Sequence, residues 1–371
     1  MIRSDAIPDF ERIRELSRQG RLYFGYGSNL SELDDTIAGR GQLASICRAF
    51  VPDTALVFDR YSEARGGGVL SLSEFPGGFV EGSLFEVNAW NELVEKEGVR
   101  RGNYIRISLP VLIRDPSTGI CRQEIAQSYV TARPEGFVKP GGDYLHFRRQ
   151  GRASHGLSCH DLDLAAAGEP GGFGGDRFAI FTYGTLCRGE SRARVMRTGP
   201  LAEVSLAEMK GVTLWRHSSG EYPCLLEADP AAGKPKPVAG DLWTYRADGE
   251  NAESLSKLFS RLDAIESDAR PKIEGLRKIV ISKLDRNHSV DEASDETRKH
   301  IEDLTADSKS SEYRRTLVDV NCHGRSHRVW TYFYCGPMAG LLPITSGNWR
   351  KYAGRWDESL ESDSMPVEDR A

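Results

Sequence analysis

The sequence predicts an α+β protein of two tandem domains, each a small sheet or barrel with helices packed outside it. The chain of 371 residues is too long for one ordinary hydrophobic core and suits two domains of about 100–200 residues each. A set of short segments recurs in the same order in the two halves. Between the two sets, residues 165–175 are rich in glycine, a composition typical of a linker.

Each repeat begins with an aromatic segment that ends in Tyr-Gly. Residues 22–30 (LYFGYGSNL) correspond to residues 178–186 (FAIFTYGTL). Residues 80–85 (VEGSLF) correspond to residues 238–243 (VAGDLW), with a glycine at the same place. Because a repeated pattern constrains the architecture more firmly than local propensity does, these matches are the main basis for the two-domain prediction.

Two further segments complete each repeat. Residues 93–97 (LVEKE) correspond to residues 262–266 (LDAIE), and residues 104–106 (YIR) correspond to residues 313–315 (YRR). Apolar residues at helical spacing predict helices over 88–94 and 252–262, which places the final glutamate of each LxxxE segment near a helix C-terminal end. Alternating or β-branched runs predict strands, which cover residues 105–113, 129–131, 317–320 and 329–334.

These patterns divide the chain as follows. The N-terminal domain covers residues 1–164, a glycine-rich linker 165–176, the C-terminal domain 177–355 and a polar tail 356–371. Within the second domain, residues 271–312 form a charged insertion. We expect this insertion to be a solvated excursion or partly disordered loop rather than a binding arm.

Composition excludes several classes of function. A formal net charge of -5 gives no general electrostatic reason to bind nucleic acid or an anionic membrane surface. No stretch has the roughly 18–20 apolar residues of a membrane span, and the charged N-terminus lacks the apolar region of a secretory signal. We therefore expect a cytoplasmic protein; the sequence leaves its oligomeric state open.

The cysteine pattern does not indicate a metal site. The seven cysteines are widely spaced and form no C-x-x-C pair, so we interpret them as reduced thiols. Cys322, His323 and His327 come nearest to a metal-binding tract, but the Gly and Arg between them favour a hairpin turn. We expect neither a metal nor another cofactor.

The Tyr-Gly-Ser-Asn segment has two interpretations when taken alone. Glycine and small polar residues are typical of a structural turn. Backbone N–H groups of such a loop also form a nest that holds a carboxylate or a developing oxyanion. The second Tyr-Gly segment and the paired glutamates favour the functional interpretation.

Longer motifs make a family resemblance specific. The first repeat resembles gamma-glutamylcyclotransferases in YFGYGSNL (23–30), GGGVLSL (66–72), VEGSLFEV (80–87), EKEGVRRGNYIRI (95–107) and GDYLHFRRQGRASHGL (142–157). The second repeat resembles the AIG2-like, gamma-glutamylamine-cyclotransferase branch in FTYGTLCRG (181–189), EYPCLLE (221–227), GDLWTY (240–245), LDAIE (262–266) and YRRTLVDV (313–320). The resemblance covers nearly everything except the linker, the insertion and the tail.

This resemblance implies two small mixed β-barrels flanked by helices, each with one site. It assigns the acid/base role to Glu97 in the first repeat and Glu266 in the second. The loops that would grip the glutamyl group are Tyr26, Gly27, Ser28 and Asn29 in the first repeat, and Tyr183, Gly184, Thr185 and Leu186 in the second. Tyr104 and Tyr144 would line the first pocket in a supporting role.

The implied reaction needs few residues. A gamma-glutamyl amide carries its own nucleophile, the alpha-amine, which closes a five-membered ring on the gamma-carbonyl, so no serine or cysteine nucleophile is required. A glutamate whose pKa is raised by apolar neighbours would take a proton from that amine and return it to the leaving amine. Ser28 as a hydrolytic nucleophile is disfavoured, because none of the histidines sits in a partnering motif.

The expected partner is therefore a small gamma-glutamyl substrate that is converted to 5-oxoproline and a free amine or amino acid. Two alternatives remain open at this stage. One or both domains would only bind gamma-glutamyl or carboxylate ligands, or the protein would be an amide hydrolase that uses water and yields glutamate. A glutamate in both repeats favours catalysis, because a binding pocket needs no proton carrier.

Overall fold

The computed structural model describes residues 7–30, 43–173, 175, 177–229, 231, 233–248, 250–306 and 312–355. The predicted polar tail, 356–371, lies outside the described residues. The chain forms two compact units. Unit 1 comprises Met1–Ile113, Arg122–Gly175 and Arg270–Ala306, and unit 2 comprises Arg114–Cys121, Asp176–Ala269 and Asp307–Ala371.

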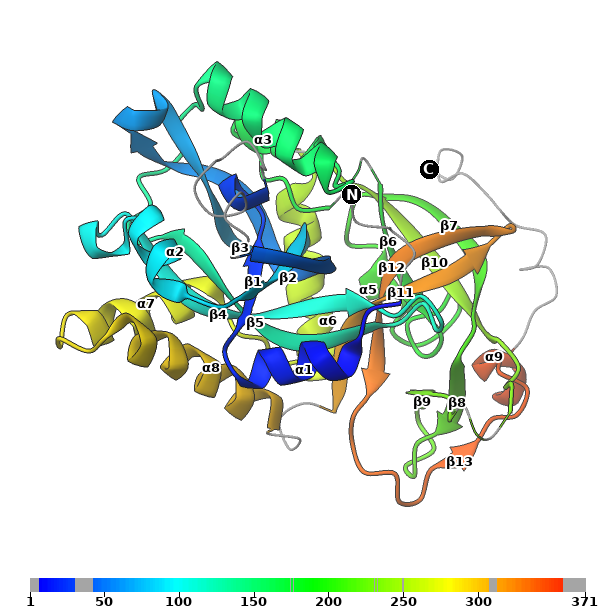
Figure 1. The fold of residues 1–371 in the computed structure, drawn as a ribbon. Coiled ribbons are helices and arrows are strands. Elements are labelled where there is room, and N and C mark those ends of the chain that lie inside the picture. The colour runs from blue at the N-terminus through cyan, green and yellow to red at the C-terminus, as the bar shows by residue number, and fades with distance from the viewer. Residues whose placement is uncertain are drawn as a thin grey trace. The chain divides into compact units, whose positions relative to one another are not determined.

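Unit 1 is built on a closed five-stranded barrel (Figure 1). The strands follow the order β1 (Leu22–Gly25), β3 (Gly67–Val87), β2 (Leu43–Ser62), β4 (Tyr104–Arg114) and β5 (Cys121–Thr131). The barrel closes where β1 pairs in parallel with β5, Tyr23 opposite Gln127. The helices of its own repeat are α1 (Phe10–Arg18), α2 (Trp90–Lys96), α3 (Gly142–Ser154) and α4 (His160–Ala167).

Unit 2 repeats this plan with a second closed barrel. Its order is β10 (Val238–Arg246), β6 (Arg177–Thr182), β12 (Arg325–Tyr334), β11 (Tyr313–Cys322) and β7 (Leu201–Met209). Here β6 pairs in parallel with β12, Ile180 opposite Trp330. A small sheet adds β13 (Leu342–Pro343), β8 (Val212–Arg216) and β9 (Pro223–Glu227), and the helices are α5 (Ala193–Met196), α6 (Ala252–Glu266) and α9 (Trp349–Tyr352). The predicted α+β class with helix-flanked barrels is confirmed.

Strand β4 shows why the barrel pattern was visible in the sequence. Its alternate residues Ile105, Ile107, Leu109, Val111 and Ile113 are buried in the core of unit 1. Such apolar side chains each contribute about 1.5–3 kcal/mol when fully buried. The predicted strands fall within β4, β5, β11 and β12, and the predicted helices match α2 and α6 to within a few residues.

The prediction of a loop for the charged insertion was wrong. Residues 273–306 form two helices, α7 (Ile273–Leu284) and α8 (Val290–Ala306), which lie side by side and belong to unit 1 (Figure 1). Ile273, Leu276 and Val280 are buried on α7, and Ala293 and Ile301 on α8. These positions recur at helical spacing and form one apolar face, which the many charged residues between them obscured. Residues 307–311 lie outside the described residues.

The predicted linker is partly built into unit 1. Residues 165–167 are the last turn of α4, which ends at Gly168 in a left-handed conformation (φ 89°). Farther along, the Gly171 carbonyl accepts a 2.7 Å hydrogen bond from Leu56 N. A Cβ at Gly171 would lie 2.0 Å from the Asp161 carbonyl oxygen, so only glycine permits this close approach.

The turn around Cys322 and His323 agrees with the prediction of a hairpin. Cys322 pairs with Arg325 at the end of the β11–β12 ladder, and His323 adopts a left-handed conformation (φ 49°). Among the described helices, none combines the length and apolar character needed to cross a membrane.

Candidate functional sites

A small cavity in unit 1 brings the predicted loop and glutamate together. The loop Tyr26–Asn29 follows β1, and Glu97 caps the C-terminal end of α2. The cavity, together with the open space at its mouth, has a volume of about 300 Å³. Its lining comprises Tyr23, Tyr26, Gly27, Ser28, Asn29, Leu70, Glu97, Tyr104, Tyr129 and Tyr144. All six residues predicted for the first loop and its supporting tyrosines, together with Glu97, therefore share one site, which we name the first cavity.

Asn29 connects the loop directly to Glu97. Its side-chain Nδ2 donates to Glu97 Oε1 at 3.0 Å and to the Tyr23 hydroxyl at 2.6 Å. Its Oδ1 accepts a hydrogen bond from Lys96 Nζ at 2.7 Å. Asn29 is buried and Glu97 is half-buried, so the amide orients a carboxylate that still reaches the cavity.

Three tyrosine hydroxyls of the first cavity form hydrogen bonds with backbone groups. Tyr26 donates to the Tyr129 carbonyl at 2.6 Å and Tyr104 donates to the Leu70 carbonyl at 3.0 Å. The Tyr144 hydroxyl accepts from Leu70 N at 3.3 Å. Burial raises the pKa of Tyr26, Tyr104 and Tyr144 above the ordinary value, so these phenols stay neutral.

A corresponding cavity, the second cavity, lies in unit 2 and, together with the open space at its mouth, has a volume of about 600 Å³. It is lined by Phe181, Thr182, Tyr183, Gly184, Thr185, Leu186, Arg192, Tyr222, Pro223, Ile265, Glu266, Glu312, Tyr313 and Tyr332. Tyr183 donates to the Tyr332 carbonyl at 2.7 Å, and Tyr313 donates to the Pro223 carbonyl at 3.1 Å. These contacts repeat those of Tyr26 and Tyr104. The predicted loop and the predicted glutamate again line one cavity.

The carboxyl of Glu266 has a strongly raised pKa. Burial raises the pKa of Glu266 from 4.5 to about 7, the Arg192 guanidinium opposes this rise, and the negative charge of Glu312 adds to it. Near neutral pH, such a carboxyl takes up and releases protons readily. The predicted effect of burial is confirmed at this position.

Glu312 brings a second carboxylate to the second cavity, together with an aromatic pair. Tyr222 OH donates to Glu312 Oε1 at 2.7 Å, and His217 Nε2 lies 3.6 Å from the same oxygen. The His217 and Tyr222 rings are stacked with centroids 4.5 Å apart. This arrangement gives the second cavity a negative group that the first cavity does not have among its lining residues.

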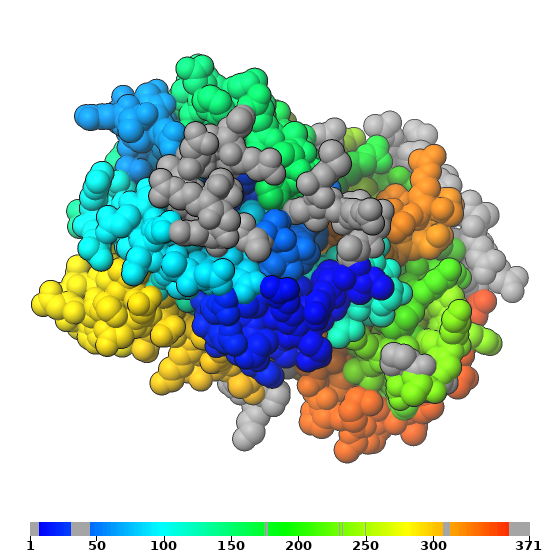
Figure 2. All heavy atoms as spheres, in the orientation of Figure 1, coloured from blue at the N-terminus to red at the C-terminus, as the bar shows by residue number. Residues whose placement is uncertain are grey.

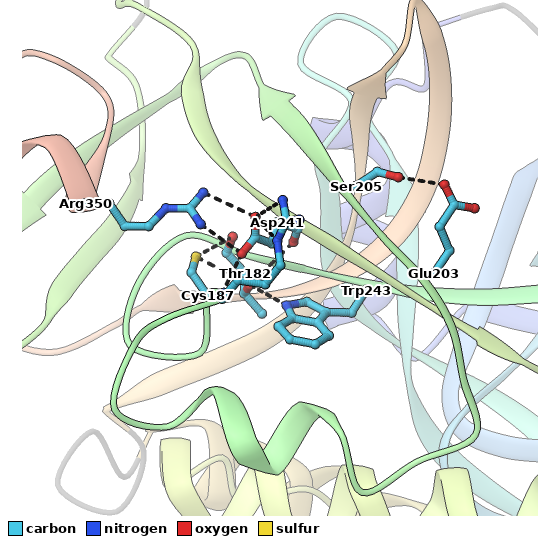
Figure 3. Close-up of polar contacts among 8 residues, drawn as sticks. Thr182, Cys187, Glu203, Ser205, Asp241, Trp243 and Arg350 are labelled. Carbon is cyan, nitrogen blue, oxygen red and sulfur yellow. Dashed lines mark hydrogen bonds and ion pairs between the residues drawn. The ribbon is translucent and has the colours of Figure 1, made fainter. Parts of the chain in front are cut away.

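A buried ion-pair network holds the second loop. Asp241, which is fully buried, accepts from Arg350 Nη1 at 3.1 Å and from Arg188 N at 2.6 Å. Figure 3 shows Asp241 between Arg350 and the cluster of Thr182, Cys187 and Trp243. Because Arg188 lies two residues after the loop Tyr183–Leu186, Asp241 holds the chain just beyond that loop against β10 and α9.

Sequence reasoning missed several cavity residues. They are Tyr23, Leu70 and Tyr129 in unit 1, and Phe181, Thr182, Arg192, Tyr222, Pro223, Ile265, Glu312, Tyr313 and Tyr332 in unit 2. One signal was available, because Tyr313 corresponds to Tyr104 in the repeat. Tyr23, Leu70, Phe181, Thr182, Tyr222, Pro223 and Ile265 lie within the quoted motifs, whereas Tyr129, Arg192, Glu312 and Tyr332 lie outside them.

Comparisons with known proteins indicate the family of this chain. The model of the family described as gamma-glutamyl cyclotransferase, AIG2-like, matches residues 180–351. Gamma-glutamylcyclotransferase of Homo sapiens is 30% identical over 161 residues, covering 42% of this chain and 81% of the human protein. The Mus musculus protein of the same name is 35% identical over 120 residues, covering 30% of this chain and 63% of the mouse protein.

Two solved structures are similar to parts or most of this chain. A structure described as gamma-glutamyl cyclotransferase has 26% sequence identity and a TM-score of 0.35, covering 40% of this chain and 88% of that one. YkqA from Bacillus subtilis has 14% identity and a TM-score of 0.28, covering 92% of this chain and 95% of that one. With four-fifths of the human protein matched at 30% identity, the chain belongs to the gamma-glutamylcyclotransferase family.

Proposed function

We propose that each barrel converts gamma-glutamyl amines or amino acids to 5-oxoproline and a free amine, with Glu97 and Glu266 as the general acid/base groups. The proposal rests chiefly on one observation: in both cavities a glutamate at a helix end shares its lining with a Tyr-Gly-Ser/Thr loop. Family membership supports the same reaction class.

The reaction is an internal acyl transfer. The substrate alpha-amine attacks its own gamma-carbonyl carbon, forming the ring C–N bond, and the carboxylate takes the proton that the amine loses. The bond from that same carbonyl carbon to the leaving nitrogen then breaks, and the same carboxyl returns the proton to that nitrogen. Because the amine and the carbonyl belong to one molecule, no bimolecular encounter is needed, and the protein has only to hold the two groups in the geometry of attack.

The protein's contribution is shape and proton transfer. We assign the loops Tyr26–Asn29 and Tyr183–Leu186 to binding the glutamyl head group, because they face the glutamates within each cavity. A free alpha-amine has a pKa near about 8 and is mostly protonated at neutral pH. Glu266, with a pKa raised to about 7, is well matched to remove that proton and to donate it again.

The test is product analysis with single and double variants. The full-length protein is incubated with gamma-glutamyl dipeptides and gamma-glutamyl amines, and 5-oxoproline, glutamate and amine are separated by chromatography. We expect wild-type protein to release 5-oxoproline and Glu97→Gln and Glu266→Gln each to silence one site. The double variant should lose about 10²–10⁴-fold of the rate, the usual contribution of general acid/base catalysis.

Three results would contradict the proposal. Undiminished 5-oxoproline from the double variant would exclude the two glutamates as acid/base groups. Glutamate in place of 5-oxoproline would indicate hydrolysis by water. Saturable binding of the substrate without any product, measured by calorimetry, would indicate a binding module.

A further inference from the structure

The two repeats each place a buried arginine behind the cavity. Arg106 and Arg315 occupy corresponding positions in the segments YIR and YRR, and their side chains are 1% and 0% exposed. The Arg106 guanidinium lies 4.7 Å from the ring centre of Trp90. That of Arg315 lies 4.5 Å from Phe259 and 4.9 Å from Trp330. A buried guanidinium needs a carboxylate partner as well as aromatic contacts, because burial of an unpaired charge is costly.

In unit 2, the partner comes from the same helix as the glutamate. Arg315 Nη2 lies 3.3 Å from Asp263 Oδ2. The other oxygen, Asp263 Oδ1, accepts a 2.7 Å hydrogen bond from the Tyr332 hydroxyl. Tyr332 lines the second cavity, and its carbonyl accepts the hydrogen bond from Tyr183. Asp263 thus connects the buried arginine to the wall of the site.

In unit 1, the corresponding position carries no carboxylate. LVEKE matches LDAIE, so Val94 stands where unit 2 has Asp263, and Val94 is buried. The carboxylate that contacts Arg106 belongs instead to Asp291, in the first turn of α8. The two inserted helices, α7 and α8, form a helical hairpin. This hairpin therefore supplies the carboxylate that the first repeat lacks at this position.

Further contacts fasten the hairpin to the same barrel wall. Ser108 N donates to Thr297 Oγ1 at 2.9 Å, and Ser108 Oγ donates to the Ser294 carbonyl at 3.2 Å. From α7, Arg277 Nε donates to the Thr131 carbonyl at 3.1 Å. In the space-filling view, the yellow surface of the hairpin adjoins the cyan surface of unit 1 (Figure 2).

Arg106 acts on two residues of the first cavity. Its aromatic partner Trp90 packs edge-on against Tyr23, with ring centres 6.2 Å apart, and Tyr23 accepts the hydrogen bond from Asn29. Burial raises the pKa of Tyr129, and the positive charge of Arg106 opposes that rise, as expected of groups in direct proximity. Tyr23 and Tyr129 both line the cavity.

We propose that the hairpin α7–α8, although encoded within the second repeat, is a positioning element of the first site and acts through the Asp291–Arg106 pair. Asp291 is not one of the residues that line the cavity; it holds Arg106, which in turn holds the aromatic wall behind Asn29 and Glu97. The expected effect on turnover rests on the proposed function. The expected effect on the order of the aromatic wall does not.

The test isolates the first site in a Glu266→Gln background and measures 5-oxoproline release. Asp291→Ala should lower kcat at least about tenfold, because small displacements of reacting groups have effects of this size or larger. Asp303→Ala removes the same exposed side chain from the same helix and should leave the rate unchanged. The decisive variant is Val94→Asp with Asp291→Ala, which restores a carboxylate at the position used in unit 2 and should recover most of the loss.

The outcomes separate this proposal from a purely structural effect. If Asp291→Ala retains the rate within about a factor of two, the proposal is overturned. Failure of Val94→Asp to restore the rate in a double variant whose thermal unfolding matches that of Asp291→Ala overturns it as well. If the Glu266→Gln protein makes no 5-oxoproline, the proposed function fails at the first site. Amide hydrogen exchange of β5 then tests whether Asp291 holds the aromatic wall in place. The exchange rate should rise in Asp291→Ala but not in Asp303→Ala.

Discussion

Replacing Glu266 by glutamine should stabilise unit 2 above about pH 7 and have little effect below about pH 4.5. The reason is that the folded protein raises the pKa of Glu266 from 4.5 to about 7, mainly by burial. An ionised Glu266 is therefore less favourable in the folded state than in the unfolded state. Glutamine has nearly the same shape and no charge, so it removes this penalty.

The magnitude follows from the change in pKa. A rise from 4.5 to about 7, at about 1.4 kcal/mol for each tenfold change in equilibrium constant, corresponds to about 3 kcal/mol. Between these two pH values the folded state binds more protons than the unfolded state, so the contribution of Glu266 to stability increases as the pH falls. This direction is opposite to that of an ordinary ion-paired carboxylate.

The assay is amide hydrogen exchange of peptides from β6 and β12, which reports the free energy of opening of unit 2 separately from unit 1. The difference between Glu266→Gln and wild type should grow from near zero at about pH 4.5 to about 3 kcal/mol at about pH 8. Glu253→Gln, on the same helix, is the control. Lys257 lowers the pKa of the native Glu253 carboxyl, so the stabilising effect of Glu253 is lost as the pH falls. Equal stability of Glu266→Gln and wild type at about pH 8 would refute the reasoning.

Three further predictions follow from single contacts. Asp241→Ala leaves Arg350 buried without its carboxylate and should lower the stability of unit 2 by about 3–5 kcal/mol, measured by urea unfolding; a change below about 1 kcal/mol would contradict this. Glu312→Gln removes a charge that raises the pKa of Glu266, so the acidic limb of the second site's pH–rate profile should move to lower pH; an unchanged profile would show that the charge is screened. Asn29→Leu removes the donor to Glu97 and should lower 5-oxoproline release in a Glu266→Gln background about tenfold, whereas the neighbouring Ser28→Ala tests whether the loop itself tolerates change.

The strands and the ends of the site-bearing helices were accessible from the sequence because they depend on local patterns. Alternation in β4 and helical spacing in α6 are properties of neighbouring residues, and they place Glu97 and Glu266 at helix ends without knowledge of the fold. Barrel closure is different, because it joins β1 to β5 across about a hundred residues. That pairing brings Tyr129 to the first cavity, and no local pattern marks it as a site residue.

The charged insertion was misjudged because its composition resembles that of a solvated loop. Its apolar residues are few, but Ile273, Leu276 and Val280 share one face of α7. Once those residues are buried, the charged residues face outward or form pairs such as Lys283 with Glu296. Periodicity was the informative signal, and total charge was misleading.

The two sites share a layout but hold their glutamates by different forces. In the first cavity, the Asn29 amide donates to Glu97. In the second, the corresponding residue is Leu186, which has no donor, and burial together with Arg192 and Glu312 sets the pKa of Glu266. A hydrogen bond fixes both the direction and the charge of a carboxylate, whereas burial without such a donor favours the protonated form. A substitution in one barrel therefore does not predict the effect of its counterpart in the other.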